Sequence, residues 1–331
     1  MNPAPRSSTD KPPRMLEFRS GGWVLWLAGL LALVSVIYQG SIIFSPKGPV
    51  SLGDGVNVAS YGFDLSRATI PVNEIVAAGL RKDDLPALVT PATVSVATQA
   101  PGATLGDVRK LTSHDHVIGV VMHGEARAYP LWVLEWHEIV DDVLGGEPIA
   151  VTYSAVSGGV VVFSRRVGDE TLEFGVSGLL YNCNLLMFDR RATPAAESLW
   201  SQLQFRAVAG PAVGRELQLL PMVVTTYKQW RDRYPTSTVI LPNRERKKFY
   251  RREAYSTYLN DDDLRFPVSP LPDNVRPKKT PVAAVRSAAG WELHYGEFGS
   301  PSVVDVPELA DDPAPRAYAF WFAWYAQRSA E

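Results

Sequence analysis

The sequence predicts an α+β protein, in which a mainly antiparallel β-sheet domain with a few helices follows one N-terminal transmembrane helix. Three observations indicate this fold class. A long apolar segment without charges lies near the N-terminus, short β-branched runs separated by turns follow from about residue 117, and helical periodicity is confined to brief stretches. The length of 331 residues is enough for two domains.

The composition is that of a globular protein and excludes several functional classes. Hydrophobic residues make up 46% and charged residues 21%, which excludes wholesale disorder. Lys plus Arg number 33 against 35 Asp plus Glu. The net charge of −2 therefore argues against a nucleic-acid partner, which would need a large phosphate-neutralising surface. A single cysteine excludes an intramolecular disulfide framework and any multi-cysteine metal site.

The N-terminal segment predicts a membrane anchor. Residues 23–44 read WVLWLAGLLALVSVIYQGSIIF and contain no charged side chain. As a helix this segment would be about 33 Å long, close to the hydrocarbon thickness of a bilayer. The alternatives are a buried core helix and a cleaved secretory signal, but such a signal has a shorter apolar region that ends in small residues. We therefore expect an uncleaved signal anchor in the lipid bilayer.

The flanking charges predict the orientation of this anchor. Four basic residues precede it, Arg6, Lys11, Arg14 and Arg19, whereas only Lys47 follows closely. Because basic flanks stay in the cytoplasm, we expect a single-pass protein of the inner or cytoplasmic membrane whose N-terminus lies in the cytoplasm. The expected parts are a disordered cytoplasmic tail (1–22), the anchor (23–44), a Pro/Gly linker (45–55) and an extracytoplasmic α+β domain (56–331).

The extracytoplasmic body begins its regular pattern with a predicted hairpin and helix. Residues 117–122 are apolar and β-branched, 123–125 form a turn, and 126–131 return as a second strand. Residues 132–143 then place their apolar side chains on one helical stripe, and the glycine pair at 145–146 ends the predicted helix.

More strands are predicted after this helix. They lie at residues 149–153, 160–165, 171–176 and 185–188. In the third of these, apolar side chains alternate with Glu173 and Gly175, which indicates one solvated face. The basic run 244–252 is expected to be a solvated face or, alternatively, a docking patch for an acidic partner.

The C-terminal tail is dense in aromatic residues. Residues 318–325 read YAFWFAWY, too short to span a membrane, and are expected to pack as a core helix or strand. Within this run, WFAW at 321–324 has an aromatic spacing similar to that of YKQW at 227–230, which leaves an internal duplication open.

The densest group of polar residues that could carry chemistry lies in 123–142. On the predicted helix His137 and Asp141 share one face, and Glu138 follows His137. A carboxylate beside an imidazole suits a general base or an oriented metal ligand, so these three are the candidate catalytic residues. A single metal ion would take His137 with further ligands such as His123. The alternative is a structural His–Asp pair.

Polar side chains on two predicted strands indicate a ligand site. Arg127 and Tyr129 point the same way if 126–131 is a strand, and an Arg fork beside a phenol suits a carboxylate or phosphate. A structural Arg–carboxylate pair is an equal alternative. Four residues further along the chain complete the candidate ligand-binding set: Tyr181, Asn184, Asp189 and Arg190.

Five long segments carry a family resemblance. They read GEARAYPLWVLEWHEIVDDVLGGEPIAVTY (124–153), FGVSGLLYNCNLLMFDR (174–190), ESLWSQ (197–202), GPAVGRELQLLP (210–221) and QWRDRYPTSTVIL (229–241). Together they resemble a prokaryotic family catalogued as domain of unknown function 3179. The resemblance implies membership and a shared fold, and it implies no particular activity. It also implies a cysteine pair, TYCPLC, where this chain has Ser154 and Ser157, so thiol chemistry at that place would be absent here.

Two functions remain open from the sequence. The first is a membrane-anchored extracytoplasmic module that binds a ligand or takes part in a membrane complex, which the lack of a complete catalytic signature favours. The second is a metal-dependent or acid/base enzyme. In it His137 would be the base or metal ligand, Asp141 would orient it, and Arg127 would hold an anionic substrate.

Overall fold

The computed structural model describes most of the chain beyond residue 51. The described residues are 52–250, 255–298 and 314–328, together with Val24, Leu27, Ala28, Leu30 and Leu31. The chain divides into two units, Met1–Val50 and Ser51–Glu331, and the fold below is that of the second. The predicted tail and most of the predicted anchor and linker lie outside the described residues. Within the described part, none of the helices has the length and apolarity that a membrane span requires.

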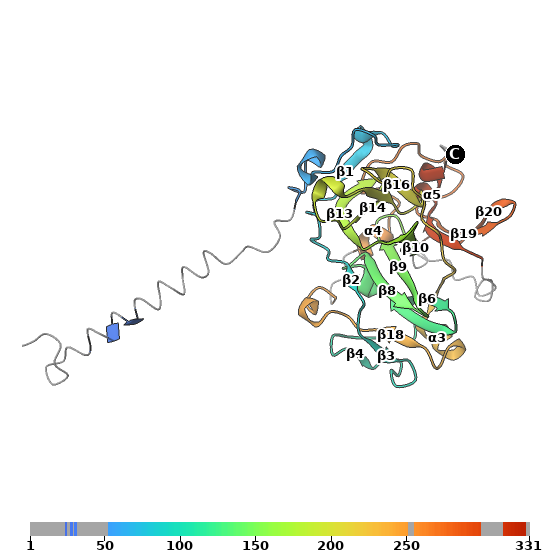
Figure 1. The fold of residues 1–331 in the computed structure, drawn as a ribbon. Coiled ribbons are helices and arrows are strands. Elements are labelled where there is room, and N and C mark those ends of the chain that lie inside the picture. Colours follow the sequence, from blue (N-terminus) through green and yellow to red (C-terminus); the bar gives the residue numbers. More distant parts are fainter. Residues whose placement is uncertain are drawn as a thin grey trace, which may run out of the picture. The chain divides into compact units, whose positions relative to one another are not determined.

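The described residues of the second unit form three large β-sheets and two two-stranded ones (Figure 1). The first sheet has five antiparallel strands, in the spatial order β1 (Ile75–Ala77), β13 (Phe174–Tyr181), β14 (Asn184–Asp189), β15 (Leu199–Ser201) and β16 (Arg206–Ala209). The central sheet has seven, in the order β2 (Leu88–Val89), β8 (Ile139–Leu144), β9 (Glu147–Ser154), β10 (Gly159–Ser164), β21 (Arg316–Phe320), β19 (Pro281–Ser287) and β20 (Gly290–Tyr295). Only the β2–β8 pair of the central sheet is parallel.

The third sheet is mixed. Its order is β17 (Val223–Thr226), β6 (His116–Met122), β7 (Glu125–Pro130), β18 (Thr238–Ile240) and β3 (Thr93–Ser95), with β7 and β18 parallel. Two short hairpins pair β4 (Thr104–Leu105) with β5 (Arg109–Lys110) and β11 (Arg166–Val167) with β12 (Glu170–Thr171).

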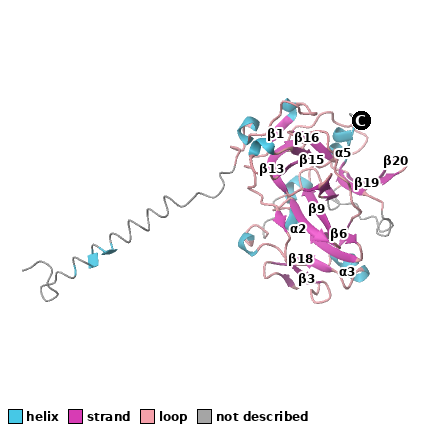
Figure 2. Cartoon of the chain, in the orientation of Figure 1, coloured by secondary structure: helices cyan, strands magenta, loops and turns pink. Residues whose placement is uncertain are grey.

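The described helices of this unit are short (Figure 2). They are α2 (Leu131–Leu134), α3 (Tyr227–Arg233), α4 (Ser256–Leu259) and α5 (Trp321–Arg328), with 3-10 turns η2 (Val58–Tyr61), η3 (Val72–Glu74), η4 (Pro194–Ala196) and η5 (Arg244–Arg246). Mixed, mainly antiparallel sheets with few helices confirm the predicted α+β class of the body.

The central sheet is covered on both faces. In β8, Val140 enters the core shared with the third sheet, whereas Ile139 enters the core shared with the first sheet. Val151 and Ala150 of β9 divide in the same way, because successive side chains of a strand point to opposite faces. Figure 1 shows the first and third sheets at opposite ends of the body with β8 and β9 between them. A third core lies on the first sheet around Tyr61.

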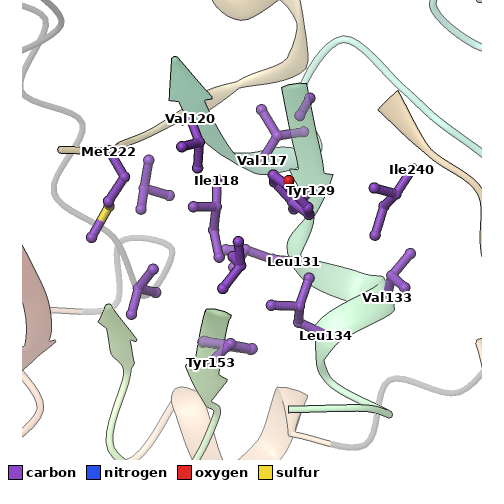
Figure 3. Close-up of a cluster of buried hydrophobic side chains, with 14 of the residues drawn as sticks. Val117, Ile118, Val120, Tyr129, Leu131, Val133, Leu134, Tyr153, Met222 and Ile240 are labelled. Carbon is purple, nitrogen blue, oxygen red and sulfur yellow. The ribbon is translucent and has the colours of Figure 1, made fainter. Parts of the chain in front are cut away.

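Side chains of the third sheet and of the central sheet meet in one hydrophobic core (Figure 3). Ile118 of β6 and Tyr129 of β7 lie in it beside Leu134 of α2, and Tyr153 reaches it from the central sheet. This contact fixes the hairpin over β8 and β9, and so it places the residues that follow α2 against the central sheet.

Several predicted strands are confirmed. The hairpin at 117–131 is β6 and β7, and the strands predicted at 149–153, 160–165 and 185–188 are β9, β10 and β14. The strand predicted at 171–176 is wrong in its start, and of the two residues predicted to be solvated, Glu173 is exposed but precedes the strand, whereas Gly175 is buried. The strand begins at Phe174 as β13, and both of its faces are buried because the core around Tyr61 covers its outer side. The aromatic tail forms both a strand, β21, and a helix, α5.

The helix predicted at 132–143 is wrong beyond its first turn. Helix α2 ends at Leu134, and strand β8 begins at Ile139. Between them, the Ile139 N–H donates to the His137 carbonyl at 2.6 Å around Glu138, whose φ is +54°. This is a γ-turn of the rare, strained type. His137 and Asp141 therefore share no helix face.

Two antiparallel strand pairs of the body, β6–β7 and β19–β21, repeat one arrangement. The strands β7 and β21 read EARAYP and RAYAF, and each is followed at once by a helix. Their pairing registers match: Ile118 with Tyr129 and Val120 with Arg127, against Ala283 with Tyr318 and Val285 with Arg316. This correspondence supports an internal duplication that relates β6–β7 to β19–β21. The similar aromatic spacing instead suggests residues 227–230 as the counterpart of the C-terminal run.

Candidate functional site

Arg127 and Tyr129 converge on an internal carboxylate. Arg127 Nη1 donates to Asp142 Oδ2 at 2.6 Å, and the Tyr129 hydroxyl donates to the same oxygen at 2.9 Å. Burial, and then the Asp142 charge, raise the pKa of Tyr129, so its hydroxyl stays protonated and keeps donating. Arg127 also donates to Thr238 Oγ1 and to the Val143 carbonyl. The structural Arg–carboxylate pair is the alternative that the geometry supports.

Asp189 and Arg190 are likewise held by neighbouring groups. Asp189 Oδ1 accepts the Ser198 N–H at 2.6 Å, and its Oδ2 accepts Arg191 Nε at 2.7 Å. Arg190 forms two 2.8 Å bonds with Asp83. Both residues close loops of the first sheet onto one another.

Asn184 belongs to a buried polar network between the first and central sheets. Its Nδ2 donates to Ser157 Oγ at 2.9 Å and to Gln202 Oε1 at 2.7 Å. Gln202 Nε2 then donates to Thr152 Oγ1 at 2.8 Å and to the Gly159 carbonyl at 3.1 Å. The network holds the β9–β10 turn against β14. Tyr181 is the last residue of β13 in the first sheet, and its backbone carbonyl accepts a hydrogen bond from Gln327 Nε2.

The two metal-ligand candidates do not meet. The exposed His123 bonds the Gly145 carbonyl through Nδ1 at 2.8 Å, whereas His137 is fully buried and contacts neither residue. Among the residues that the structure describes, no group of three or more His, Cys, Asp or Glu side chains is arranged to hold a metal ion. The predicted single metal ion therefore has no ligand set in that part of the chain.

Both ring nitrogens of His137 are occupied. Nδ1 lies 2.6 Å from the Pro86 carbonyl, which can only accept, so Nδ1 carries the proton. Nε2 then accepts the Tyr250 hydroxyl, which in turn accepts the Asn243 N–H at 3.1 Å. Burial lowers the pKa of His137 to about 4, and the imidazole is neutral at pH 7. His137 thus joins segments that lie far apart in the sequence.

Asp141 links two sheets rather than orienting His137. Its Oδ2 accepts the Phe174 N–H at 2.6 Å, and Arg165 Nε lies 3.9 Å from Oδ1. Burial raises the pKa of Asp141 to about 7, against the opposing effect of Arg165. Arg127, His137 and Asp141 have separate partners, and the grouping predicted for an acid/base enzyme is not found.

Glu138 differs from the other candidates because its carboxyl group has no partner among the described residues. No hydrogen bond or ion pair joins that carboxyl to any residue in the described part of the chain. The residue is only 8% exposed, and burial raises its pKa to about 8. It is also the strained central residue of the γ-turn. A buried, unpaired carboxyl in an unfavourable backbone conformation is the strongest functional signal in the described residues.

Tyr255 lies near this carboxyl, and Arg265 and Tyr258 lie against Tyr255 or against each other. Burial, followed by the Glu138 charge, raises the pKa of Tyr255 to about 12, and Arg265 acts on the same hydroxyl in the opposite direction. The Arg265 guanidinium carbon lies 5.6 Å from the Tyr255 ring centre and 5.0 Å from that of Tyr258. Trp136, in the same turn as Glu138, packs against the same hydrophobic core as Tyr255. We call Trp136, Glu138, Tyr255, Tyr258 and Arg265 the Glu138 site.

The segment that supplies the tyrosines also covers two turns of the sheets. The Tyr258 hydroxyl donates to the Val156 carbonyl at 2.7 Å, and the Ser269 N–H donates to Asn182 Oδ1 at 2.8 Å. Asn182 Nδ2 and Ser154 Oγ are buried without a hydrogen-bond partner among the residues that the structure describes. The unsatisfied atoms of Ser154 and Asn182 therefore lie close in sequence to residues that the segment 255–269 bonds, and the same segment supplies Tyr255 next to Glu138.

Sequence reasoning identified Glu138 but missed most of its surroundings. Tyr250 lies in the run interpreted as a solvated basic face, yet it is fully buried on His137. Tyr255, Tyr258 and Arg265 were not candidates. The available signal was the recurrence of tyrosines in an otherwise polar stretch, because a tyrosine there needs an apolar contact for its ring.

A family model described as "Protein of unknown function (DUF3179)" matches residues 82–297, which is more than half of the chain. The matched range includes every residue of the Glu138 site. Neither the curated proteins nor the solved structures gave a match.

Proposed function

This chain belongs to the DUF3179 family of proteins of unknown function, and we propose that it is a binding module that takes a small molecule at the Glu138 site. The observation that carries the proposal is the buried Glu138 carboxyl in a γ-turn, which has no partner among the described residues. A positive φ at a non-glycine residue costs about 1–3 kcal/mol, and burial of an unpaired polar group adds to this cost. Such a combination is typical of sites that serve a ligand rather than the fold.

The chemistry follows from the protonation state of the carboxyl. With a pKa near 8, Glu138 is mostly a neutral carboxylic acid at pH 7 and can donate one hydrogen bond. A ligand oxygen that accepts this bond would complete the missing partner. Trp136 and Tyr255 supply aromatic surface beside it, as is usual for small-molecule sites.

Binding of small probes to the full chain tests this proposal. Ligand-observed NMR would titrate acetate, benzoate, benzamide and inorganic phosphate at pH 6.5 and pH 9.5. We expect at least one probe to bind at pH 6.5. Anionic probes should weaken about tenfold or more at pH 9.5, because an ionised Glu138 repels them and no longer donates.

Two variants and one control localise the effect. Glu138→Gln should keep binding at both pH values, because an amide still donates, whereas Glu138→Leu should lose it. Glu125→Gln, an exposed carboxyl on β7, is the matched control and should bind as the parent does. The proposal falls if no probe binds with a dissociation constant below about 10 mM, or if binding ignores both Glu138 variants.

The acid/base enzyme with His137, Asp141 and Arg127 is not supported. Each of these side chains already bonds other parts of the fold, to Tyr250, Phe174 and Asp142 respectively. No other observation in the described residues favours that reaction.

We further propose that residues 23–44 anchor the protein in the cytoplasmic membrane with the N-terminus in the cytoplasm, where it could join a membrane complex. The charge-free composition of this segment and the basic residues before it support the proposal. In alkaline carbonate, the full chain should stay with the membranes and a variant lacking residues 1–45 should be released. Alkaline phosphatase fused to the C-terminus should be active. Release of the full chain, or an inactive phosphatase fusion, would contradict the assignment.

A further inference from the structure

Arg265, which has no carboxylate partner among the described residues, acts on the same Tyr255 hydroxyl as Glu138. No ion pair joins Arg265 to an acidic residue in the described part of the chain. Its guanidinium is stacked over the rings of Tyr255 and Tyr258, at 5.6 and 5.0 Å. Asp261, whose pKa Lys279 and then Arg265 help to lower, is bonded to Lys279 at 3.0 Å. The Arg265 guanidinium is thus positioned by the two tyrosine rings, and no ion pair within the described residues occupies its N–H groups.

Arginines elsewhere in the body show what a structural role looks like. Arg127 is held by Asp142 and Arg190 by Asp83, in bonds of 2.6 and 2.8 Å. Both belong to pairs that join strands or loops. Arg265 makes no such connection, and its side chain remains exposed to solvent.

We propose that Arg265 binds the charged group of the ligand, and that the ligand of the Glu138 site is a small organic carboxylate. This inference rests on the proposed function. The guanidinium offers paired N–H donors that fit both oxygens of a carboxylate. Stacking on two tyrosine rings reduces the rotamer freedom that binding must remove.

The neutral Glu138 makes the carboxylate preference stronger. A protonated carboxyl donates to an anionic oxygen without repulsion, and charge-assisted hydrogen bonds of this kind are about twice as strong as neutral ones. A cationic ligand would be repelled by Arg265. The bound anion also favours the protonated form of Glu138, so binding at pH 8.5 should take up a proton.

Matched neutral and charged probes test the inference on the full chain. Benzoate and benzamide have the same shape and differ in charge, so benzoate should bind about tenfold more tightly to the parent at pH 6.5. Arg265→Gln should remove this difference, and Arg265→Lys should retain part of it because it keeps a charge but loses the fork. Arg276→Gln is the matched control, since Arg276 is also stacked on aromatic rings, those of Tyr295 and Trp321.

Proton uptake gives a second readout that a purely structural arginine would not change. Calorimetry of benzoate binding at pH 8.5 in buffers of different ionisation enthalpy should show uptake in the parent and none in Glu138→Gln. The inference is overturned if benzamide binds as well as benzoate, if only phosphate binds, or if Arg265→Gln changes nothing. In those cases, binding that still depends on Glu138 would support the proposed function and contradict only the role of Arg265. If no probe binds at all, both proposals are contradicted.

Discussion

Two adjacent residues, His137 and Glu138, are both uncharged at pH 7 because burial acts on them in opposite directions. Burial lowers the pKa of the imidazole to about 4 and raises that of the carboxyl to about 8. The difference is that His137 bonds Pro86 and Tyr250, whereas Glu138 has no partner in the described residues. One residue of the pair therefore stabilises the fold, and the other is available to a ligand.

Replacement of Glu138 should stabilise the protein in a pH-dependent manner. In the unfolded chain this carboxyl ionises near pH 4.5, but in the folded state only near pH 8. The folded state therefore binds the proton more tightly, and the parent loses stability as pH rises from about 4.5 to 8. Glu138→Gln removes this loss and should be more stable than the parent by about 5 kcal/mol at pH 8.5. Below pH 4.5 the advantage should be much smaller.

Denaturant unfolding across this pH range is the measurement. Glu125→Gln replaces an exposed carboxyl and should follow the parent at every pH. A Glu138→Gln variant whose stability runs parallel to that of the parent would show that the carboxyl is not held neutral in the fold.

At the scale of single elements, the strands were predictable and the segment after α2 was not. The strands β9, β10 and β14 are short apolar runs between turns, and this pattern leaves few alternatives. Apart from the exposed Val143, the residues of β8 are buried on both faces, so the apolar positions of the strand also match a helical stripe. The γ-turn at Glu138 separates the helix from the strand, and no residue type at this position predicts such a turn.

The same error explains what was missed at the candidate site. The pairing of His137 with Asp141 depended on a helix that does not form, while Glu138 was identified for the wrong reason. Tyr255 and Arg265 come from a segment distant in sequence from Glu138, and sequence patterning does not report contacts between such segments.

Gly159 of β10 is the element-level position where a small change should be costly. A Cβ there would lie 2.5 Å from Gln202 Oε1 and 2.9 Å from Ser157 Oγ, so the network that holds the β9–β10 turn would have to move. We expect Gly159→Ala to destabilise the protein by about 1–3 kcal/mol. Thermal and denaturant unfolding would measure this change.

The control for this substitution is Gly124→Ala in the β6–β7 turn. A Cβ on Gly124 meets no atom within 4 Å, and only its φ of +86° is unfavourable. This variant should cost about 1 kcal/mol. If Gly159→Ala is no more costly than Gly124→Ala, the network is not as closely packed as its distances indicate.

On the scale of the whole molecule, the class of fold could be predicted but the stacking of its sheets could not. Antiparallel hairpins follow from local patterns, whereas the order of the central sheet depends on contacts between distant strands. The pairing of β10 with β21 joins the middle of the chain to its last strand. No periodicity within either strand encodes that partner.

Removal of the C-terminal residues 314–331 should prevent the body from folding. The deletion takes away β21, which lies between β10 and β19, and with it the cover supplied by α5. Circular dichroism and limited proteolysis should show loss of a cooperative transition. A variant lacking residues 1–50, which belong to the other unit, should keep the transition. A folded truncation at residue 313 would contradict the central place of β21.

The position of β21 has a consequence for how this protein is made. The last strand along the described residues, β21, is also an interior strand of the seven-stranded sheet. This sheet therefore cannot close until residue 320 has left the ribosome, and β10 and β19 stay unpaired at these edges until then. Premature termination would leave two exposed strand edges, a form suited to degradation or aggregation.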